Sequence, residues 1–398
     1  MQEIARIPYL EKLISLRDKD LIKVITGVRR CGKSTLLHLF RDYLLSDGVG
    51  ESQIVYLNFE DYDNKPLRDP DSLYAYLKPT IQSGVPTYVL LDEIQQVVRF
   101  EEVIDSLYQK KGVDIYLTGS NAYMLSSEIA TLLSGRYIEI KVYPFSFKEI
   151  CGIPVAESAA RRYSDYVRYG SFPYVQSLLD NPSLVADYLE SLYNTIVLKD
   201  IMQRRRFTDP LMLDSIIRFM FDNIGNMVSS KSIADTLTSN GRKIDVKTVE
   251  RYLDAMMDCF ILYEAKRYDI KGKQLLKTLG KYYVVDPGMR NVLLGNRGYD
   301  VGRVLENVVF LELKRRYREV YIGKLDSLEV DFVAVDEGGI TYYQVAETVR
   351  EQSTLERELR PFTLIGDHYP KFLLTLDEDP PTHFDGIRKV NVLDWLVE

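Results

Sequence analysis

The stretch Gly27-Val28-Arg29-Arg30-Cys31-Gly32-Lys33-Ser34 follows an apolar run, Leu21 to Thr26, and precedes a helix that we expect to begin at Lys33. A buried strand, a turn with two glycines and a helix form the context in which backbone amides can surround a phosphate group. The octet fits the pattern G-x-x-x-x-G-K-[ST] at every position. It therefore predicts that the chain binds a nucleoside triphosphate.

The residue types in this loop suit that chemistry. The Lys33 ammonium is placed to reach the β- and γ-phosphates, and the Ser34 hydroxyl is placed to bind Mg²⁺. The helix N-terminus adds a partial positive charge. The residues that we expect to contact the nucleotide are Gly27, Arg29, Arg30, Cys31, Gly32, Lys33, Ser34 and Thr35.

A second buried strand, Tyr88 to Leu91, ends in the carboxylates Asp92 and Glu93. Downstream of a phosphate-binding loop, such a pair predicts that Asp92 holds Mg²⁺ through water and that Glu93 acts as the general base. The apolar run Gln53 to Phe59 adds a strand between the two motifs. This favours the class of P-loop ATPases in which an extra strand separates the two motif-bearing strands.

Two later segments provide further candidates. The strand Val113 to Thr118 is followed by Ser120 and Asn121, which would either sense the γ-phosphate or cap the next helix. Arg136 precedes a last strand, Tyr137 to Val142. It would either complete its own or a neighbouring site as an arginine finger or lie on the surface.

Four stretches together resemble one group of prokaryotic AAA+ ATPases that carry a C-terminal domain of unknown function related to restriction-endonuclease-like folds. They are Gly-Val-Arg-Arg-Cys-Gly-Lys-Ser-Thr, Leu-Leu-Asp-Glu-Ile-Gln, Leu-Thr-Gly-Ser-Asn, and Ser-Gly-Arg-Tyr followed by Tyr-Pro-Phe-Ser-Phe-Lys-Glu. The resemblance covers essentially the whole chain. It implies ATP binding and hydrolysis on an AAA+ core but supplies no substrate.

Composition sets the outer bounds. A chain of 398 residues is long enough for two to four domains, and no apolar run approaches the length of a membrane span. The three cysteines are far apart, and the N-terminus lacks the build of a signal peptide, so we expect a cytoplasmic protein without disulfides. The three histidines and three cysteines show no spacing typical of zinc ligands.

After a helical lid at residues 144–207, residues 208–285 read as a winged-helix domain. Helices at 212–223 and 229–237 precede a recognition helix at 245–257 and a β-hairpin. Residues 229–283 carry eleven Lys and Arg against seven Asp and Glu, a net charge of +4, whereas the whole chain carries −7. This basic segment in an acidic chain suggests DNA contact, although winged helices also bind proteins.

The recognition helix has an apolar face, which we expect to pack in the core, and a polar face, which we expect to contact DNA. We expect Val246, Val249, Tyr252, Leu253 and Met256 to face the core. The candidate DNA-binding residues are Lys243, Lys247, Thr248, Arg251, Lys271 and Lys273.

The C-terminal residues 286–398 follow a restriction-endonuclease-like plan. A helix carries Glu306, the second of three strands carries Asp331, and the third strand reads Gln344-Val345-Ala346. In active enzymes of this plan two carboxylates hold Mg²⁺ and a lysine activates water. Glutamine is a poor ligand and alanine cannot replace the lysine, so cleavage would need a migrated lysine such as Lys314 or Lys324. We expect an inactive, degenerate site.

The sequence therefore predicts an α/β protein: an AAA+ core (1–143) with a three-layer fold, a lid, a winged helix and a nuclease-like domain. We expect an ATPase, with ATP and Mg²⁺, that remodels or moves along a bound partner, in the first place DNA. One alternative is a nucleotide-dependent switch that acts on a protein partner; another is an ATP-regulated nuclease. A homo-oligomer is expected because neighbours often complete AAA+ sites.

Overall fold

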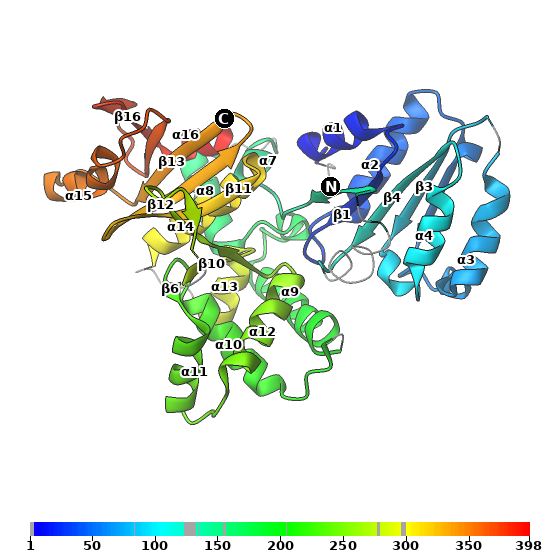
Figure 1. Cartoon of the computed structure of the whole chain (residues 1–398), viewed down its shortest axis with the longest axis horizontal. Coiled ribbons are helices and arrows are strands. Elements are labelled where there is room, and N and C mark those ends of the chain that lie inside the picture. Colours follow the sequence, from blue (N-terminus) through cyan, green and yellow to red (C-terminus); the bar gives the residue numbers. More distant parts are fainter. Residues whose placement is uncertain are drawn as a thin grey trace. The chain divides into compact units, whose positions relative to one another are not determined.

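The computed structural model divides the chain into two compact units (Figure 1). The first comprises Met1–Pro144 and Asp258–Phe260, and the second Phe145–Met257 and Ile261–Glu398. The structure describes residues 4–82, 84–122, 133, 135–153, 157–203, 205–276, 279–295 and 300–398.

The first unit is built on a parallel sheet of five strands in the order β2-β3-β4-β1-β5. The strands are β1 (Ile22–Thr26), β2 (Ile54–Asn58), β3 (Thr87–Asp92), β4 (Val113–Gly119) and β5 (Tyr137–Lys141). Because β4 lies between β1 and β3, the predicted separation of the two motif-bearing strands is confirmed. The strand that separates them in space is β4, whereas β2, which lies between the motifs in sequence, forms an edge of the sheet.

Helices cover both faces of this sheet. They are α1 (Ile7–Leu16), α2 (Lys33–Ser46), α3 (Pro70–Leu77) and α4 (Phe100–Tyr108), with short 3₁₀ turns η1 (Glu51–Gln53), η2 (Lys65–Arg68), η3 (Lys78–Thr80) and η4 (Ile94–Gln96). Apolar residues of α3 and α4 share one core with alternate strand residues such as Val24 and Leu91. On the opposite face, Phe40 of α2 packs against Tyr116 of β4 with ring centroids 4.6 Å apart. The first unit therefore has the three layers that the sequence predicted.

The second unit begins with helices, as predicted. They are α7 (Phe147–Cys151), α8 (Ala159–Tyr169), η5 (Pro173–Ser177), α9 (Pro182–Thr195) and a π-helical segment η6 (Ile196–Gln203). The helices are interrupted at Gly170, which has a φ of 85°. A Cβ atom there would lie 2.2 Å from Oδ1 of Asp286, and Oδ2 of the same carboxylate accepts a hydrogen bond from the Ser171 amide at 2.6 Å. Glycine is thus required by both backbone conformation and space.

A three-stranded sheet with three helices follows. The elements are α10 (Pro210–Asp222), β6 (Met227–Val228), α11 (Ser230–Ser239), α12 (Val246–Asp258), β7 (Leu262–Ala265) and β10 (Gly280–Val284), and the sheet order is β6-β10-β7. Four of the five predicted core residues of α12 are buried. Val246 was predicted wrongly, because it begins the helix and is 37% exposed, while Ala255 is buried.

The predicted single hairpin is divided between two sheets. Its base, β7 and β10, pairs within the three-stranded sheet, whereas its tip consists of β8 (Arg267–Asp269) and β9 (Gln274–Leu275). Strand β8 also pairs in parallel with β11, opposite Ile322 to Lys324. The tip is therefore the edge of a larger sheet and not an isolated wing.

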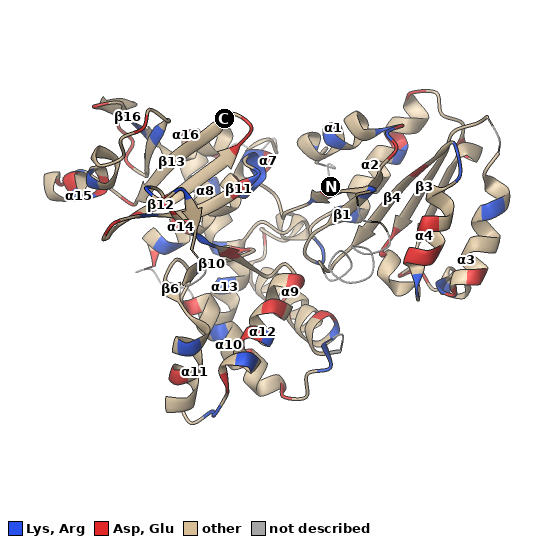
Figure 2. Cartoon of the chain, in the orientation of Figure 1, with Lys and Arg blue, Asp and Glu red and all other residues tan. Residues whose placement is uncertain are grey.

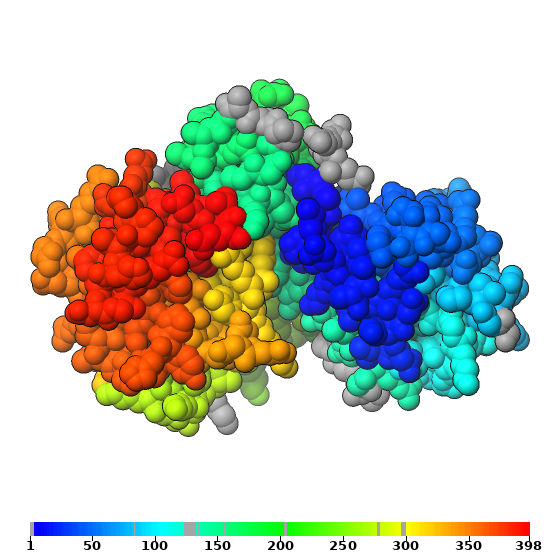
Figure 3. All heavy atoms as spheres, turned by 90° about the horizontal axis from the view of Figure 1, so that it is seen from above, coloured from blue at the N-terminus to red at the C-terminus, as the bar shows by residue number. Residues whose placement is uncertain are grey.

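That larger sheet has eight strands in the order β15-β16-β14-β13-β12-β11-β8-β9. The helices and strands of this part of the chain are α13 (Pro287–Leu294), α14 (Val301–Arg316), β11 (Glu319–Leu325), β12 (Leu328–Asp336), β13 (Gly339–Ala346), α15 (Gln352–Thr363), β14 (Lys371–Thr375), β15 (Thr382–Phe384), β16 (Ile387–Asn391) and α16 (Val392–Val397). In the space-filling view of Figure 3 its C-terminal segments, orange to red, form an exposed surface of the second unit. No helix of the described residues is both long and apolar enough to cross a membrane.

Candidate nucleotide-binding and hydrolysis site

The loop between β1 and α2 has the geometry of a phosphate cradle. Gly27 has a φ of 150°, and a Cβ atom on it would lie 2.1 Å from the Val142 carbonyl oxygen. Gly32 precedes α2 with a φ of 101°, and Arg30 is also left-handed at 65°. These conformations curl the chain so that amides at the start of α2 can face a single anion.

Lys33 is buried at the start of α2. Its Nζ donates hydrogen bonds to the carbonyl oxygens of Gly27 at 3.0 Å and Val28 at 3.2 Å, and it lies 3.7 Å from Oε1 of Glu93. The neutral carbonyls satisfy its donors but supply no counter-charge. Phosphate oxygens are stronger partners for the same ammonium, because they carry charge.

Asp92 stands at the end of β3, opposite the loop. Thr118 Oγ1 donates to its Oδ1 at 2.5 Å, Tyr56 donates to its Oδ2 at 3.3 Å, and the Ser34 hydroxyl also bonds to the carboxylate. Burial raises the pKa of Asp92, and the charge of Glu93 contributes to the rise. The structure thus brings the two predicted metal-binding residues, Ser34 and Asp92, into direct contact.

Glu93 takes a left-handed backbone conformation with a φ of 54°, which is uncommon for a residue other than glycine. Its amide donates to Thr118 Oγ1 at 2.8 Å, and its Oε2 accepts hydrogen bonds from Ser120 Oγ at 3.2 Å and from the Gln95 amide. Burial alone would raise the pKa of Glu93, but Lys33 and the hydrogen bonds outweigh burial and lower it. The carboxylate is therefore ionised at neutral pH, as a general base must be.

The other predicted nucleotide contacts differ in their accessibility. Arg29 pairs with Glu60 at 2.7 Å, Arg30 is exposed, and Thr35 is half-buried. The Cys31 side chain is fully buried, and burial raises the pKa of its thiol. The Cys31 carbonyl accepts a hydrogen bond from the guanidinium of Arg6 at 2.8 Å, so this residue supports the loop from behind.

The two predicted sensor residues have separate environments. Ser120 contacts Glu93, so it lies at the proposed reaction centre. Asn121 is buried, and its amide donates to Sγ of Cys259 at 3.7 Å. Ser120 is therefore the sensor candidate that is hydrogen-bonded to the carboxylate pair.

Arg136 lies at the other end of the sheet. It immediately precedes β5, whose first residue pairs with Ile22 at the beginning of β1, whereas the phosphate loop follows the end of β1. Its guanidinium pairs with Asp105 at 2.5 Å and lies over the Tyr108 ring. This position is incompatible with a role as the arginine finger of its own site. If Arg136 is an arginine finger, it must act on the site of a neighbouring subunit.

Sequence reasoning missed four residues that support the site: Thr118, Tyr56, Gln95 and Arg6. Thr118 links the Glu93 amide to the Asp92 carboxylate, and Gln95 bonds to Glu93. Strand-end position and proximity to Glu93 were the available signals for Thr118 and Gln95. For Tyr56 and Arg6 the sequence carries no comparable signal.

The donor set fits Mg²⁺ bound together with a nucleotide. Among the described residues, no three His, Cys, Asp or Glu side chains form a group that could hold a metal ion. A hydroxyl and one carboxylate suffice here, because Mg²⁺ keeps several waters and takes its other ligands from phosphates.

In the second unit, the predicted nuclease-site carboxylates Glu306 and Asp331 do come together, but around a lysine that sequence analysis did not consider. Lys281 Nζ lies 2.9 Å from Glu306, 2.7 Å from Glu329 and 4.0 Å from Asp331. Tyr283 also donates to Glu306, at 2.6 Å. The ammonium thus occupies the space among the carboxylates.

Gln344, the third predicted residue of this site, has a bridging position. Its Oε1 accepts from the Asp331 amide at 3.3 Å, and its Nε2 donates to Glu358 of α15 at 2.8 Å. Burial raises the pKa of Asp331 well above its ordinary range, and Glu306 adds to the rise.

The candidate DNA-binding residues lie on exposed parts of the second unit but do not form a uniformly basic surface. Helix α12 carries two basic and three acidic residues, and Figure 2 shows both signs along it. Thr248 bonds to Asp245 at the start of the helix, Arg251 lies over the Phe207 ring, and Lys271 pairs with Asp326. Lys243, Lys247 and Lys273 are exposed.

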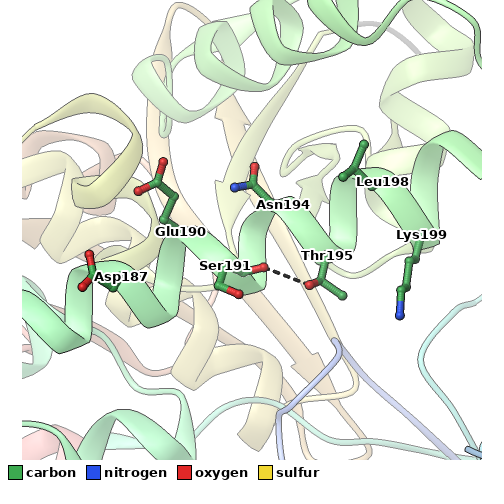
Figure 4. Close-up of a pocket in the computed structure, with 7 residues that line it drawn as sticks. All are labelled: Asp187, Glu190, Ser191, Asn194, Thr195, Leu198 and Lys199. Atoms are coloured by element: carbon green, nitrogen blue, oxygen red, sulfur yellow. Dashed lines mark hydrogen bonds between the residues drawn. The ribbon is translucent and has the colours of Figure 1, made fainter.

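A shallow hollow of about 440 Å³ lies along α9 and the start of η6 (Figure 4). It is lined by Asp187, Glu190, Ser191, Asn194, Thr195, Leu198 and Lys199. It contains none of the residues that the sequence predicted for a site.

The sheet order, the phosphate loop and the carboxylates on the adjoining strand define a P-loop AAA-type ATPase. Residues 19–151 match the family described as AAA domain, and residues 160–300 match a domain of unknown function (DUF8612). The latter overlaps the segments predicted as the lid and the winged helix.

Relatives span the whole chain. It is 42% identical over 400 residues to an uncharacterized protein of Haemophilus influenzae, with 99% of each covered, and the chain belongs to that protein's family. An uncharacterized protein of Methanocaldococcus jannaschii is 29% identical, covering 94% of this chain and 85% of its own. A Walker-type ATPase of Pyrococcus abyssi superposes with a TM-score of 0.51 at 19% identity, covering 73% of this chain and 96% of its own, which shows a shared fold.

Proposed function

We propose that the first unit hydrolyses ATP and that the protein uses hydrolysis to move or remodel a bound partner, which we take to be DNA. One observation carries the hydrolysis: Lys33, Ser34, Asp92 and Glu93 converge at the carboxyl ends of β1 and β3. In open α/β sheets this is the edge at which ligands bind.

Each residue has a step in the reaction. The loop amides and Lys33 hold the phosphates after Lys33 releases the two carbonyl oxygens. Ser34 and Asp92 would hold Mg²⁺, which neutralises charge on the phosphates when bound. Glu93 takes a proton from water as that water attacks the γ-phosphorus and the bond to the bridging oxygen breaks.

The variant Glu93→Gln tests this proposal. We expect it to bind ATP normally but to hydrolyse it about 10²- to 10⁴-fold more slowly, because an amide cannot accept the proton. Phosphate release and calorimetric ATP binding measure the two effects. Glu51→Gln, at an exposed position away from the loop, is the control and should retain full turnover. Unchanged turnover in Glu93→Gln would remove Glu93 from its role.

The DNA partner is supported by the order of elements in the second unit. Helices α10, α11 and α12 with strands β6, β7 and β10 follow the winged-helix order. The surplus of acids on α12 and the pairing of Lys271 instead favour the second candidate, a nucleotide-dependent switch that acts on a protein.

Binding of random-sequence DNA at two salt concentrations separates the two. If DNA is the partner, Lys247→Ala/Arg251→Ala should weaken binding and reduce the slope of log K against log salt by about 2. Lys110→Ala/Lys111→Ala in the first unit is the charge-matched control. No binding at moderate salt would favour the protein partner.

We propose that the second unit retains a nuclease-like core without cleavage activity. The order α14-β11-β12-β13-α15-β14 supports the restriction-endonuclease-like plan. The ammonium of Lys281 supplies the charge that a metal would bring. Nicking that depends on Mg²⁺ and disappears in Asp331→Ala would instead establish a nuclease.

Four domains remain our proposed division: 1–143, 144–207, 208–285 and 286–398. We also propose a homo-oligomer in which Arg136 reaches a neighbour's nucleotide. Mixing Arg136→Ala with Glu93→Gln subunits tests this. Hydrolysis would then require that an Arg136→Ala subunit, which keeps Glu93, lie beside a Glu93→Gln subunit, which keeps Arg136.

A further inference from the structure

Gln95 is folded back onto the proposed general base. It lies in the 3₁₀ turn Ile94–Gln96, which directly follows the left-handed Glu93. Its Nε2 donates to Oε2 of Glu93 and lies 3.5 Å from Ser120 Oγ. The turn and the unusual backbone of Glu93 together bring the two side chains face to face.

The contact with a carboxylate fixes the orientation of the amide. Nε2 must face Glu93, because the opposite orientation would set the amide oxygen against the carboxylate. Oε1 of Gln95 therefore points away from Glu93. This oxygen is buried and has no hydrogen-bond partner among the described residues.

A buried acceptor without a donor costs about 1–3 kcal/mol, so such atoms usually have a partner in the working protein. A water molecule can donate one proton to Oε1 of Gln95 and the other to the neighbouring carboxylate of Glu93. Both acceptors belong to residues just beyond Asp92, at the carboxyl end of β3 where the γ-phosphate would lie.

We propose that Gln95 positions the attacking water for Glu93, an inference that rests on the proposed hydrolysis. Gln95 Oε1 accepts a hydrogen bond from one water proton and keeps the water oxygen aimed at the γ-phosphorus. Glu93 takes the other proton as the oxygen–phosphorus bond forms and ADP leaves. Gln95 itself gains and loses no proton.

The test compares Gln95→Ala and the shape-matched Gln95→Met with Gln96→Ala, which removes the adjacent glutamine. We expect both changes at Gln95 to lower kcat by ~10²-fold, with ATP affinity within a few-fold of wild type. Gln96→Ala should behave as wild type. Circular dichroism checks that each variant is folded.

The outcomes distinguish this inference from the proposed function. Wild-type kcat in both variants at Gln95 would overturn the positioning role while hydrolysis stands. A loss of ATP affinity equal to the loss of kcat would also overturn it, since a structural role predicts that result. Absence of turnover in the wild-type protein would refute the hydrolysis itself.

Discussion

Lys33 in the first unit and Lys281 in the second are both buried lysines that lie near carboxylates, yet their charges are neutralised to different extents. Lys33 bonds to two neutral carbonyls, and the Glu93 carboxylate lies 3.7 Å from it. Lys281 has carboxylates at 2.9, 2.7 and 4.0 Å. Burial alone would lower the pKa of Lys281, but these acids raise it.

The difference shows what makes a buried charge available to a ligand. A cation held by neutral groups gains when an anion arrives, whereas a cation enclosed by acids has no such gain. The first arrangement suits a binding site, and the second suits a fixed structural link between β10, α14 and β12. Residue types alone do not distinguish the two.

The largest effects should come from a crossed experiment. Lys33→Met should weaken ATP binding by ~10²-fold or more, because hydrogen bonds to charged groups are worth about 1.5–3 kcal/mol each. Lys281→Met should leave ATP affinity nearly unchanged but lower the free energy of unfolding of the second unit by about 3–5 kcal/mol, since it strands buried carboxylates.

Calorimetry and urea unfolding measure these two quantities. The assigned roles require that Lys33→Met lose ATP affinity but not stability, and that Lys281→Met lose stability but not ATP affinity. A Lys281→Met protein that is as stable as wild type would contradict the structural role.

An intermediate effect on thermal stability should appear at two aspartates, Asp331 in the second unit and Asp92 in the first. Asp331 holds its proton more tightly in the folded than in the unfolded chain, so its contribution to stability falls as pH rises above the ordinary carboxyl pKa. Asp331→Asn removes this dependence and should raise Tm at pH 8 by about 2–4 °C, equivalent to ~1 kcal/mol, and by less at pH 5.

Asp92 provides the matched case, because burial raises its pKa too. Asp92→Asn should also stabilise the protein without nucleotide, but it should remove the further stabilisation that Mg²⁺ and ATP give together. Thermal unfolding at pH 5 and pH 8 with and without both ligands measures these effects. A lower Tm for Asp331→Asn at pH 8 would contradict the account.

The smallest effects should come from two tyrosines that contact the carboxylates. Tyr283→Phe removes a buried 2.6 Å hydrogen bond to Glu306 and should cost about 1 kcal/mol of unfolding free energy. Tyr56→Phe removes a 3.3 Å contact to Asp92 from a half-buried residue, so water can replace it and the cost should be near zero. Urea unfolding gives both values; equal costs would remove the contrast between the sites.

Local pattern predicted the first unit well. The phosphate loop, the helix beginning at Lys33 and the strand ending at Asp92 all lie within short stretches whose spacing sets their geometry. Such contacts between neighbours in sequence depend on few other parts of the chain. The loop and the carboxylate pair were therefore recognisable before any fold was known.

Pairings across the chain were not predictable in the same way. Lys281 meets Glu306 and Glu329 from a separate sheet, and the hairpin tip at Lys271 joins a strand 55 residues further along. Arg136 lies far from the phosphate loop because β5 runs parallel to β1. The start of β5 therefore lies beside the start of β1, whereas the loop follows the end of β1. These outcomes follow from strand order and register, which local pattern leaves open.

The sequence by itself determined that a phosphate loop and an acidic strand end exist in this chain, because glycine placement and hydrophobic periodicity act over a few residues. Only the tertiary structure decided which charges face each other: a buried lysine available to phosphate in one unit and one enclosed by acids in the other. The physical reason is that charge compensation falls off over a few ångströms in space, whereas the partners lie tens of residues apart along the chain.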